Sequence, residues 1–325
     1  MGPELTAAVI GASGIGKHHA KWFHGLGCRV AAFAGTSAES VAATSGNLEQ
    51  LFGFSGEGYA SVEEMLDSGS YDLISVCSPE ELHYEHVMPA LDHGAHVMVE
   101  KPLLFDASLD SSRMLEMGER MVAAAEDAEC VAAINTQYVA AVSSYQKLMS
   151  DAGAETGPPE TFFMQMESRG GDEGTDYEQI FIDLGSHPIS VLMGFCGSGE
   201  MVAEGASCVV ERKSVEAEFD YRMDDGGVCR AQIVCRNRPE GELVRRFGIN
   251  GALVDYRGGN DEQGVYRAFL SHEGREFCDT DFVETSLAEF VGAVRGDHSR
   301  PLVTLAEGLE NLRMQLTLLE MADRA

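Results

Sequence analysis

Short apolar runs alternate with helical patterns through the first 138 residues of the chain. The runs are apolar at nearly every position, which is typical of strands buried on both faces of a parallel sheet. They lie at 6–12, 29–35, 72–78, 96–101 and 130–138. Helical patterns lie between them at 16–26, 37–46, 62–69, 82–94 and 107–126. This order predicts an α/β fold built on a doubly wound parallel sheet.

The pattern changes after a connection at 150–160 that is rich in glycine and proline. Half-alternating segments such as EAEFDYRM, GVCRAQIVCR and GALVDYR follow, and they predict a mostly antiparallel sheet with one face covered. Helical patterns at 285–296 and 305–324 end the sequence. We therefore predict a first domain of α/β type over 1–128 and a second domain of α+β type over 129–325. Packing of the C-terminal helix against the first domain is compatible with this division.

Charge and cysteine content narrow the possible partners. The 325 residues include 53 acidic and 23 basic ones, which gives a formal net charge of −30. Nucleic acids and anionic membranes bind positive surfaces, so we expect neither as a partner. The eight cysteines form no C-x-x-C pair, and residues 1–6 lack the basic start and apolar stretch of a secretory signal, so we expect a reduced, cytoplasmic protein. We expect no metal site, because the spaced histidines of helix 82–94 lack further ligands at suitable spacing.

A glycine-rich loop follows the first predicted strand. In VIGASGIGKHHA, Gly11 and Gly16 occupy the first and third positions of the pattern G-x-G-x-x-G, and Ser13 stands at the second. The small residues allow a tight turn and let a pyrophosphate approach the N-terminus of the next helix. The candidate cofactor-binding residues of this loop are Gly11, Ala12, Ser13, Gly14, Ile15 and Gly16.

The end of the second predicted strand bears on the choice between NAD and NADP. An acidic side chain there would bind the ribose 2′-hydroxyl and repel a 2′-phosphate. The sequence instead reads Gly35, Thr36, Ser37, and the first carboxylate is that of Glu39. Either cofactor is compatible with this strand end, and the missing carboxylate favours NADP slightly. The lack of a neighbouring lysine or arginine weakens that preference.

Two later strand ends bring polar residues to the same edge of the sheet. Ser78 and Pro79 end one strand, and Glu100 and Lys101 end the next, in the stretch HVMVEKPLLF. Ligands of open α/β sheets bind outside the carboxyl ends of the strands. We therefore expect Lys101 to face the cofactor crevice, where an ammonium group can donate a hydrogen bond or a proton to a substrate hydroxyl.

An aspartate and a histidine lie four residues apart in FIDLGSHPISVLMGF. On one helix, Asp183 and His187 would share a face. Because Pro188 is tolerated only in a first turn, we expect that helix to begin close to Leu184 or Gly185. His187 could then transfer a proton while Asp183 orients it or the substrate.

With these elements in order, the chain resembles the Gfo/Idh/MocA family of oxidoreductases. The resemblance covers nearly the whole chain and is carried by the loop with His19, by CSPEELHYEHVMPALDHGAHVMVEKPL, by DLGSH and by RPLVTLAEGLENL. It implies that 1–128 form a dinucleotide-binding Rossmann domain. It implies that 129–325 form a substrate-binding and oligomerisation domain with a large, open, mostly antiparallel sheet. It also implies hydride transfer between nicotinamide and a hydroxyl-bearing carbon of a sugar, inositol or related polyol.

The resemblance further implies roles for single residues. His187 would be the base for the hydroxyl proton, Lys101 would polarise the hydroxyl oxygen, and Asp183 would place the substrate. Ser78, Pro79 and His83 would line the nicotinamide side, Glu100 would brace the cofactor or the lysine, and the Lys101–Pro102 bond is often cis in the family. Two departures are Ser13 and Gln137. Gln137 stands where many members have an arginine, in a region that borders the substrate, so an anionic substrate is less supported.

Several alternatives stay open at this point. Some members of the family keep their nicotinamide bound and cleave glycosides without net redox change, and a non-catalytic nucleotide-binding regulator is a third possibility. The acidic residues of the segment 168–179 favour a neutral or cationic substrate; they are Asp172, Glu173, Asp176 and Glu178. The family also implies a homodimer or homotetramer formed through the second sheet.

Overall fold

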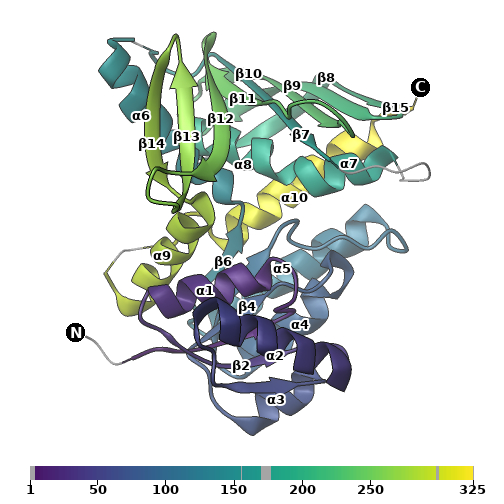
Figure 1. Cartoon of the computed structure of the whole chain (residues 1–325). Coiled ribbons are helices and arrows are strands. Elements are labelled where there is room, and N and C mark those ends of the chain that lie inside the picture. The colour runs from purple at the N-terminus through teal and green to yellow at the C-terminus, as the bar shows by residue number, and fades with distance from the viewer. Residues whose placement is uncertain (1–3, 155, 170–176, 298–299, 325) are drawn as a thin grey trace. The chain divides into compact units, whose positions relative to one another are not determined.

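A computed structural model describes residues 4–154, 156–169, 177–297 and 300–324 of the chain (Figure 1). The chain forms two compact units. Unit 1 comprises residues 1–136 and 283–309, and unit 2 comprises residues 137–282 and 310–325. None of the helices in the described ranges is both long enough and apolar enough to cross a bilayer.

The sheet of unit 1 has six strands in the order β3-β2-β1-β4-β5-β6. All five strand pairs are parallel. This is the strand order of a Rossmann fold, with the switch point between β1 and β4, so the predicted doubly wound sheet is confirmed. The strands are β1 (Thr6–Ile10), β2 (Arg29–Ala34), β3 (Glu57–Tyr59), β4 (Leu73–Val76), β5 (His96–Glu100) and β6 (Ala132–Asn135).

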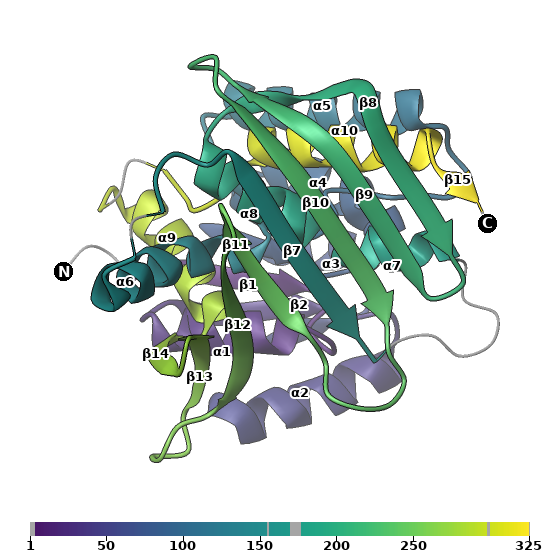
Figure 2. The same cartoon turned by 90° about the horizontal axis from the view of Figure 1, so that it is seen from above.

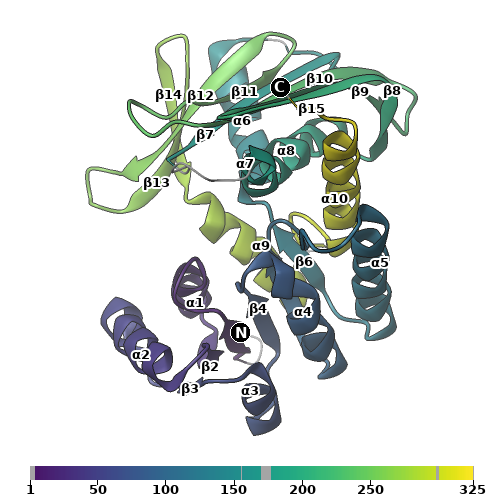
Figure 3. The same cartoon turned by 90° about the vertical axis from the view of Figure 1, so that its right-hand side faces the viewer.

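Helices cover both faces of this sheet. Helices α1 and α2 are neighbours on one face, and α4 and α5 are neighbours on the other (Figure 3). The α2 helix begins after the cap residue Ser37 and ends at Gly53, whose φ of 78° favours glycine. It extends beyond the end at residue 46 that the sequence predicted. The helices of this part are α1 (Gly16–Gly25), α2 (Ala38–Phe52), α3 (Val62–Ser68), η1 (Glu80–Leu82), α4 (His83–Asp92) and α5 (Ser111–Asp127).

The core of unit 1 explains the continuous apolar runs. Ala7 and Val9 of β1 are fully buried, and they belong to the same apolar cluster as Phe23 of α1. Leu287 and Phe290 of α9 (Phe282–Arg295) join this cluster from far along the sequence. Because both faces of the strands are covered, no alternation of polar residues is needed.

The sheet of unit 2 is open and has nine strands in the order β14-β13-β12-β11-β7-β10-β9-β8-β15 (Figure 2). Its pairs are antiparallel except β7 with β10 and β8 with β15, so the predicted mostly antiparallel sheet is also confirmed. The strands are β7 (Thr161–Ser168), β8 (Gly199–Glu211), β9 (Ser214–Met223), β10 (Val228–Asn237), β11 (Arg245–Ile249), β12 (Ala252–Asn260), β13 (Tyr266–His272), β14 (Arg275–Thr280) and β15 (Asp323–Arg324).

One face of this sheet is covered by helices of the same unit (Figure 3). In β10, the side chains of Cys229, Ala231 and Ile233 are fully buried, while Arg230 between them is exposed. The apolar half of the alternation therefore faces the helices, as antiparallel sheets with one solvated face require. The helices are η2 (Gln137–Ala140), α6 (Ala141–Ala152), α7 (Tyr177–Leu184), α8 (Ser186–Cys196) and α10 (Leu305–Glu320), of which α10 begins in unit 1.

The division of the chain differs from the predicted one. The predicted boundary at 128/129 precedes β6, which pairs in parallel with β5 and so extends the first sheet. Residues 283–309 also belong to unit 1, although they follow the second sheet in the sequence. A boundary read along the sequence cannot show a later helix that packs back into an earlier core.

Candidate active site

The loop between β1 and α1 is shaped by two glycines. Gly11 has a φ of +84°, and a Cβ added to it would lie 2.5 Å from the backbone oxygen of Cys77. A Cβ on Gly16 would lie 2.5 Å from the oxygen of Gly11. Around Gly14, by contrast, no other atom lies within 4 Å of such a Cβ. The turn is therefore closed on its inner side and open beside Gly14, as a loop that admits a pyrophosphate must be.

Helix α1 begins without a side-chain cap. Its N-cap residue is Ile15, which makes no capping hydrogen bond, and the first turn holds no acidic residue. The first N–H groups of a helix lack partners within the helix, and an uncapped terminus leaves them for a ligand such as a phosphate. The glycine turn and the helix terminus together fit the dinucleotide that the sequence predicted.

A cavity of about 980 Å³ opens beside this loop, at the carboxyl ends of β1, β2 and β4. Its walls also contain residues that the sequence did not single out, namely Ser40, Thr44 and His86. Ile15, Gly16, Ser37, His83, Glu100 and Lys101 are not among the wall residues. Of the predicted cofactor-binding residues, the wall contains Gly11, Ala12, Ser13, Gly14, Gly35, Thr36, Ser78 and Pro79.

The wall at the end of β2 is hydroxylic. The backbone N–H of Thr36 donates to Ser40 Oγ at 3.2 Å, and Ser37 caps α2 by accepting from the N–H of Ser40 at 3.2 Å. Ser37 is thus used to start the helix, and Thr36 and Ser40 face the cavity. The strand end carries no carboxylate, as the sequence indicated.

His83 lies behind the cavity wall instead of in it. Its ring is 1% exposed, with Nε2 2.9 Å from the oxygen of Ser78 and Nδ1 3.0 Å from that of Pro102. Burial lowers the pKa of His83, so the ring is neutral and donates from one nitrogen at a time. This geometry gives His83 a bracing position between two strand-end segments, and His86 stands nearer the cavity, with Nδ1 2.9 Å from Ser78 Oγ.

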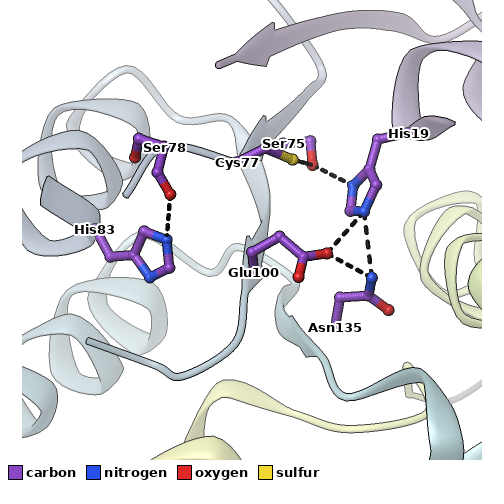
Figure 4. A network of polar contacts seen from close by, with 7 residues as sticks. All are labelled: His19, Ser75, Cys77, Ser78, His83, Glu100 and Asn135. Atoms are coloured by element: carbon purple, nitrogen blue, oxygen red, sulfur yellow. Dashed lines mark hydrogen bonds and ion pairs between the residues drawn. The ribbon is translucent and has the colours of Figure 1, made fainter. Parts of the chain in front are cut away.

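Glu100 is the centre of a buried polar network in unit 1 (Figure 4). Its Oε1 accepts from Asn135 Nδ2 at 2.6 Å and lies 2.9 Å from His19 Nε2. The other ring nitrogen of His19 lies 2.7 Å from Ser75 Oγ. Four elements, α1, β4, β5 and β6, thus meet at one carboxylate next to Lys101.

The network holds opposite charges away from water. Burial alone would lower the pKa of His19, but the neighbouring Cys77 and the carboxylate of Glu100 raise it to about 10. Burial alone would raise the pKa of Glu100, but the hydrogen bonds and charge of His19 and the Asn135 amide lower it. Glu100 is therefore an ionised, fixed group at the end of β5, and the peptide that follows Lys101 is cis, as the family resemblance suggested.

Asp183 and His187 lie on two consecutive helices. Asp183 is exposed near the end of α7, and His187 is 5% exposed in the first turn of α8. The expected start of a helix close to Leu184 or Gly185 agrees with the N-cap of α8 at Gly185, but Asp183 lies on the helix before it and not on the same one. Pro188 has no N–H for the carbonyl of Leu184, so the helical bonding is interrupted around Gly185.

Two amides of α10 donate to carbonyls on either side of this interruption. Gln315 Nε2 donates to the oxygen of Phe181 at 2.6 Å, and Asn311 Nδ2 donates to the oxygen of Ser186 at 2.7 Å. Both amides are buried, so these carbonyls gain partners that water cannot supply. This holds the turn that carries His187.

An aromatic cluster surrounds His187 in unit 2. The ring of Tyr138 lies edge-on to the His187 ring with 4.8 Å between centroids, and Tyr256 lies 5.3 Å from Tyr138. Phe282 stacks on Tyr256 at 5.4 Å. Burial raises the pKa of Tyr138 to about 12, so its hydroxyl stays protonated at neutral pH. The structure thus gives His187 a fixed, largely apolar setting within unit 2, while Lys101 ends β5 in unit 1.

Known proteins are similar to this chain in sequence and in fold. The model of the GFO_IDH_MocA oxidoreductase family, with its NAD-binding Rossmann fold, matches residues 5–136. The chain is 33% identical to 1,5-anhydro-D-fructose reductase of Ensifer adhaerens, over 97% of this chain and 95% of that protein. The chain belongs to the Gfo/Idh/MocA family.

Two further comparisons describe this Gfo/Idh/MocA member. It is 28% identical to scyllo-inositol 2-dehydrogenase (NADP(+)) IolW of Bacillus subtilis, over 61% of this chain and 58% of the relative, which is less than two thirds of the relative's length. A solved structure of UDP-N-acetylglucosamine 3-dehydrogenase GnnA from Acidithiobacillus ferrooxidans has the same fold, with a TM-score of 0.72, 18% identity and coverage of 99% and 98% of the two chains.

Some site residues of this family member were missed at the sequence level. Asn135 and Ser75 lie inside apolar strands, and only their burial together with His19 marks them. Ser40 and His86 lie on helices whose orientation toward the cavity follows from the fold alone. The acidic segment that favoured a neutral or cationic substrate lies mostly outside the described residues.

Proposed function

We propose that this protein is an NAD(P)-dependent oxidoreductase that transfers hydride between a hydroxyl-bearing carbon of a sugar, inositol or related polyol and a nicotinamide. The observation that carries the proposal is the glycine-lined cavity at the carboxyl ends of β1, β2 and β4, beside the uncapped start of α1. The family supports it, because the relatives named above are a sugar reductase and an inositol dehydrogenase.

The residues of unit 1 are proposed to hold the cofactor. The N–H groups at the start of α1 and the backbone around Gly14 would bind the pyrophosphate, and Gly35 and Thr36 would lie beside the adenosine ribose. When bound, the nicotinamide supplies the carbon that accepts or donates hydride. Glu100, held by His19 and Asn135, would fix the end of β5 and so the direction of the Lys101 side chain.

Three side chains are proposed to act on the substrate. His187 would remove the proton from the reacting hydroxyl during oxidation and return it during reduction. Lys101 would donate a hydrogen bond to the same oxygen and stabilise the negative charge that develops there. Asp183 would orient the substrate or the imidazole. The tight packing of His187 by Tyr138 supports this role, because a base must be held in one orientation.

The proposal is tested by incubating the purified protein with NAD⁺ or NADP⁺ and a panel of sugars and inositols. We expect reduced nicotinamide to accumulate in proportion to the substrate oxidised. A tightly bound nucleotide that never exchanges with added cofactor, with a glycoside cleaved at the same time, would instead identify the redox-neutral activity. Binding of nucleotide without turnover of any compound would favour the regulator.

We also propose that NADP is preferred over NAD, because the end of β2 has hydroxyl groups where an acidic side chain would repel the 2′-phosphate. The Thr36→Asp variant is expected to lower kcat/KM for NADP⁺ about tenfold or more, since it places like charge beside the phosphate. Steady-state rates with both cofactors measure this. Thr36→Asn, of similar shape and no charge, is the matched control, and equal effects of the two variants would contradict the assignment.

A homodimer or homotetramer formed through the uncovered sheet face is proposed as the assembly. The apolar side chains of β10 face the unit's own helices, so the free face offers charged pairs instead: Arg230 with Asp220 at 3.2 Å and Arg236 with Glu216 at 2.5 Å. Light scattering is expected to give two or four times the chain mass of 35.0 kDa. A single species of one chain at micromolar concentration would refute the assembly.

A further inference from the structure

Arg245 occupies a strand position that the alternation of β11 assigns to the covered face of the sheet. Phe247 and Ile249, two and four residues later, are buried on that face at 1% and 5% exposure. Arg246 points the opposite way, where its Nε donates to Asp255 Oδ1 at 2.7 Å. A partly buried guanidinium on the apolar side of a strand is costly unless something uses its charge.

Two tyrosine rings lie beside Arg245. Burial raises the pKa of both hydroxyls, and the carboxylate of Asp281 is close enough to both to raise their pKa further. Its guanidinium carbon lies 5.8 Å from the ring centroids of both Tyr138 and Tyr256. Tyr138 is also the ring that packs against His187 at 4.8 Å, so the positive charge stands one side chain away from the proposed base. Within the ranges that the structure describes, the buried Nε of Arg245 has no hydrogen-bond partner. Buried donors without partners are rare in proteins, so this arginine is held at a cost that its terminal nitrogens must offset.

The backbone before Arg245 is held firmly. The N–H of Val244 donates to Glu167 Oε2 at 2.9 Å, and the N–H of Glu167 donates to the oxygen of Val244 at 3.0 Å. Glu167 is itself 3% exposed, so water does not compete for these bonds. The start of β11 is therefore fixed, and the guanidinium is presented from a rigid strand instead of a loose loop. Such positioning is what a specificity-determining residue requires.

We propose that Arg245 binds a carboxylate of the substrate, and that the substrate is therefore a sugar acid or polyol acid. The inference rests on the proposed function, since it places the carboxylate beside the reacting hydroxyl at His187. A planar guanidinium can donate from its two terminal nitrogens to both oxygens of a carboxylate, and the aromatic rings exclude water from that contact. The proposal replaces the expectation of a neutral or cationic substrate, which depended on an acidic segment and on Gln137 in place of an arginine. Arg245 supplies a guanidinium beside Tyr138, the residue that follows Gln137.

The test compares sugars with their C6 acids: D-glucose with D-glucuronate, D-galactose with D-galacturonate, and D-mannose with D-mannuronate. We expect the wild-type protein to turn over at least one acid with kcat/KM about 100-fold above that of its neutral partner. Arg245→Gln is expected to raise KM for that acid about 30- to 100-fold while kcat changes only a few-fold. The KM for the neutral partner should not change, because no contact with it is lost.

Two further variants sharpen the comparison. Arg246→Gln removes the adjacent guanidinium from the opposite face and should leave both KM values unchanged, which controls for net charge and for stability. Arg245→Lys keeps the charge without the planar pair of donors and should fall between wild type and Arg245→Gln. Equal KM for the acid in Arg245→Gln and Arg246→Gln, or a preference for neutral sugars in the wild type, would overturn the proposal.

Failure of the proposed function can be recognised separately. If no sugar reduces the nicotinamide, calorimetric titration of the nucleotide-loaded protein with the same acids still tests Arg245. Binding of an acid that Arg245→Gln loses and Arg246→Gln keeps would support the carboxylate site without the oxidoreductase activity. Absence of binding by every acid in the panel would overturn the site as well.

Discussion

The His187→Asn variant is expected to lower kcat about a thousandfold, because general acid–base catalysis contributes about 10²–10⁴ to a rate. Lys101→Met is expected to lower kcat by a similar factor, because the variant cannot donate a hydrogen bond to the reacting oxygen. In both variants the dissociation constant of the nucleotide should change little, since the cavity walls contain neither side chain. Steady-state kinetics on the best substrate, with fluorescence titration of the reduced nucleotide, measures both quantities.

His24→Gln serves as the control for these two variants. His24 is exposed on α1, outside the cavity walls, so the kcat of this variant should match that of the wild type. Unchanged kcat in His187→Asn and Lys101→Met would show that the catalytic assignment is wrong. A loss of nucleotide binding together with activity would point to damage of the fold instead, and the thermal midpoint would reveal it.

The second large effect concerns stability. His19→Gln leaves the Glu100 carboxylate buried at 7% exposure without its positive partner, and removal of one member of a buried ion pair costs about 3–5 kcal/mol of unfolding free energy. Urea denaturation at pH 6.5 should show this difference as a lower midpoint with an unchanged slope. His24→Gln on the same helix should shift the free energy by less than about 0.5 kcal/mol.

The stability difference should depend on pH in a defined direction. The pKa of His19 is raised from 6.5 to about 10, so its stabilising contribution is complete below pH 6.5 and is lost as the pH rises toward 10. The difference in the free energy of unfolding between wild type and His19→Gln should therefore decrease from pH 6.5 to pH 10. The double variant His19→Gln, Glu100→Gln should recover part of the loss at pH 6.5. A gap that widens with pH would mean that His19 is neutral in the folded protein.

Much of the fold could be predicted because its signals are local. Continuous apolar strands alternating with helices define a parallel sheet, and the loop with Gly11 and Gly16 identifies its first turn from glycines that no other residue can replace. Pro188 likewise placed the start of α8 correctly within two residues. Local patterns could not show that α9 joins the first core, and α6 was not predicted although one of its faces is apolar.

The sequence predicted candidate site residues only where the residue type and its place at a strand end or turn both indicated a ligand. Gly14, Thr36 and Ser78 were found because strand ends and glycine turns point to one edge of the sheet. The partners of Glu100 were missed, because Asn135 is 35 residues away along the chain and nothing in its own strand marks it. Arg245 was missed because it stands beside Arg246 and the two look alike in the sequence. The strand register, which only the structure gives, shows which of the two faces the core.

The central claim is hydride transfer between a carbon that bears a hydroxyl group and C4 of the nicotinamide. It is tested most directly by supplying the best substrate of the panel with deuterium at the reacting carbon, together with excess NADP⁺, and by examining the released nucleotide by NMR. Direct hydride transfer predicts one deuterium at C4 of each reduced nucleotide formed, in amounts equal to the ketone produced. Product formed without deuterium in the free nucleotide would contradict it.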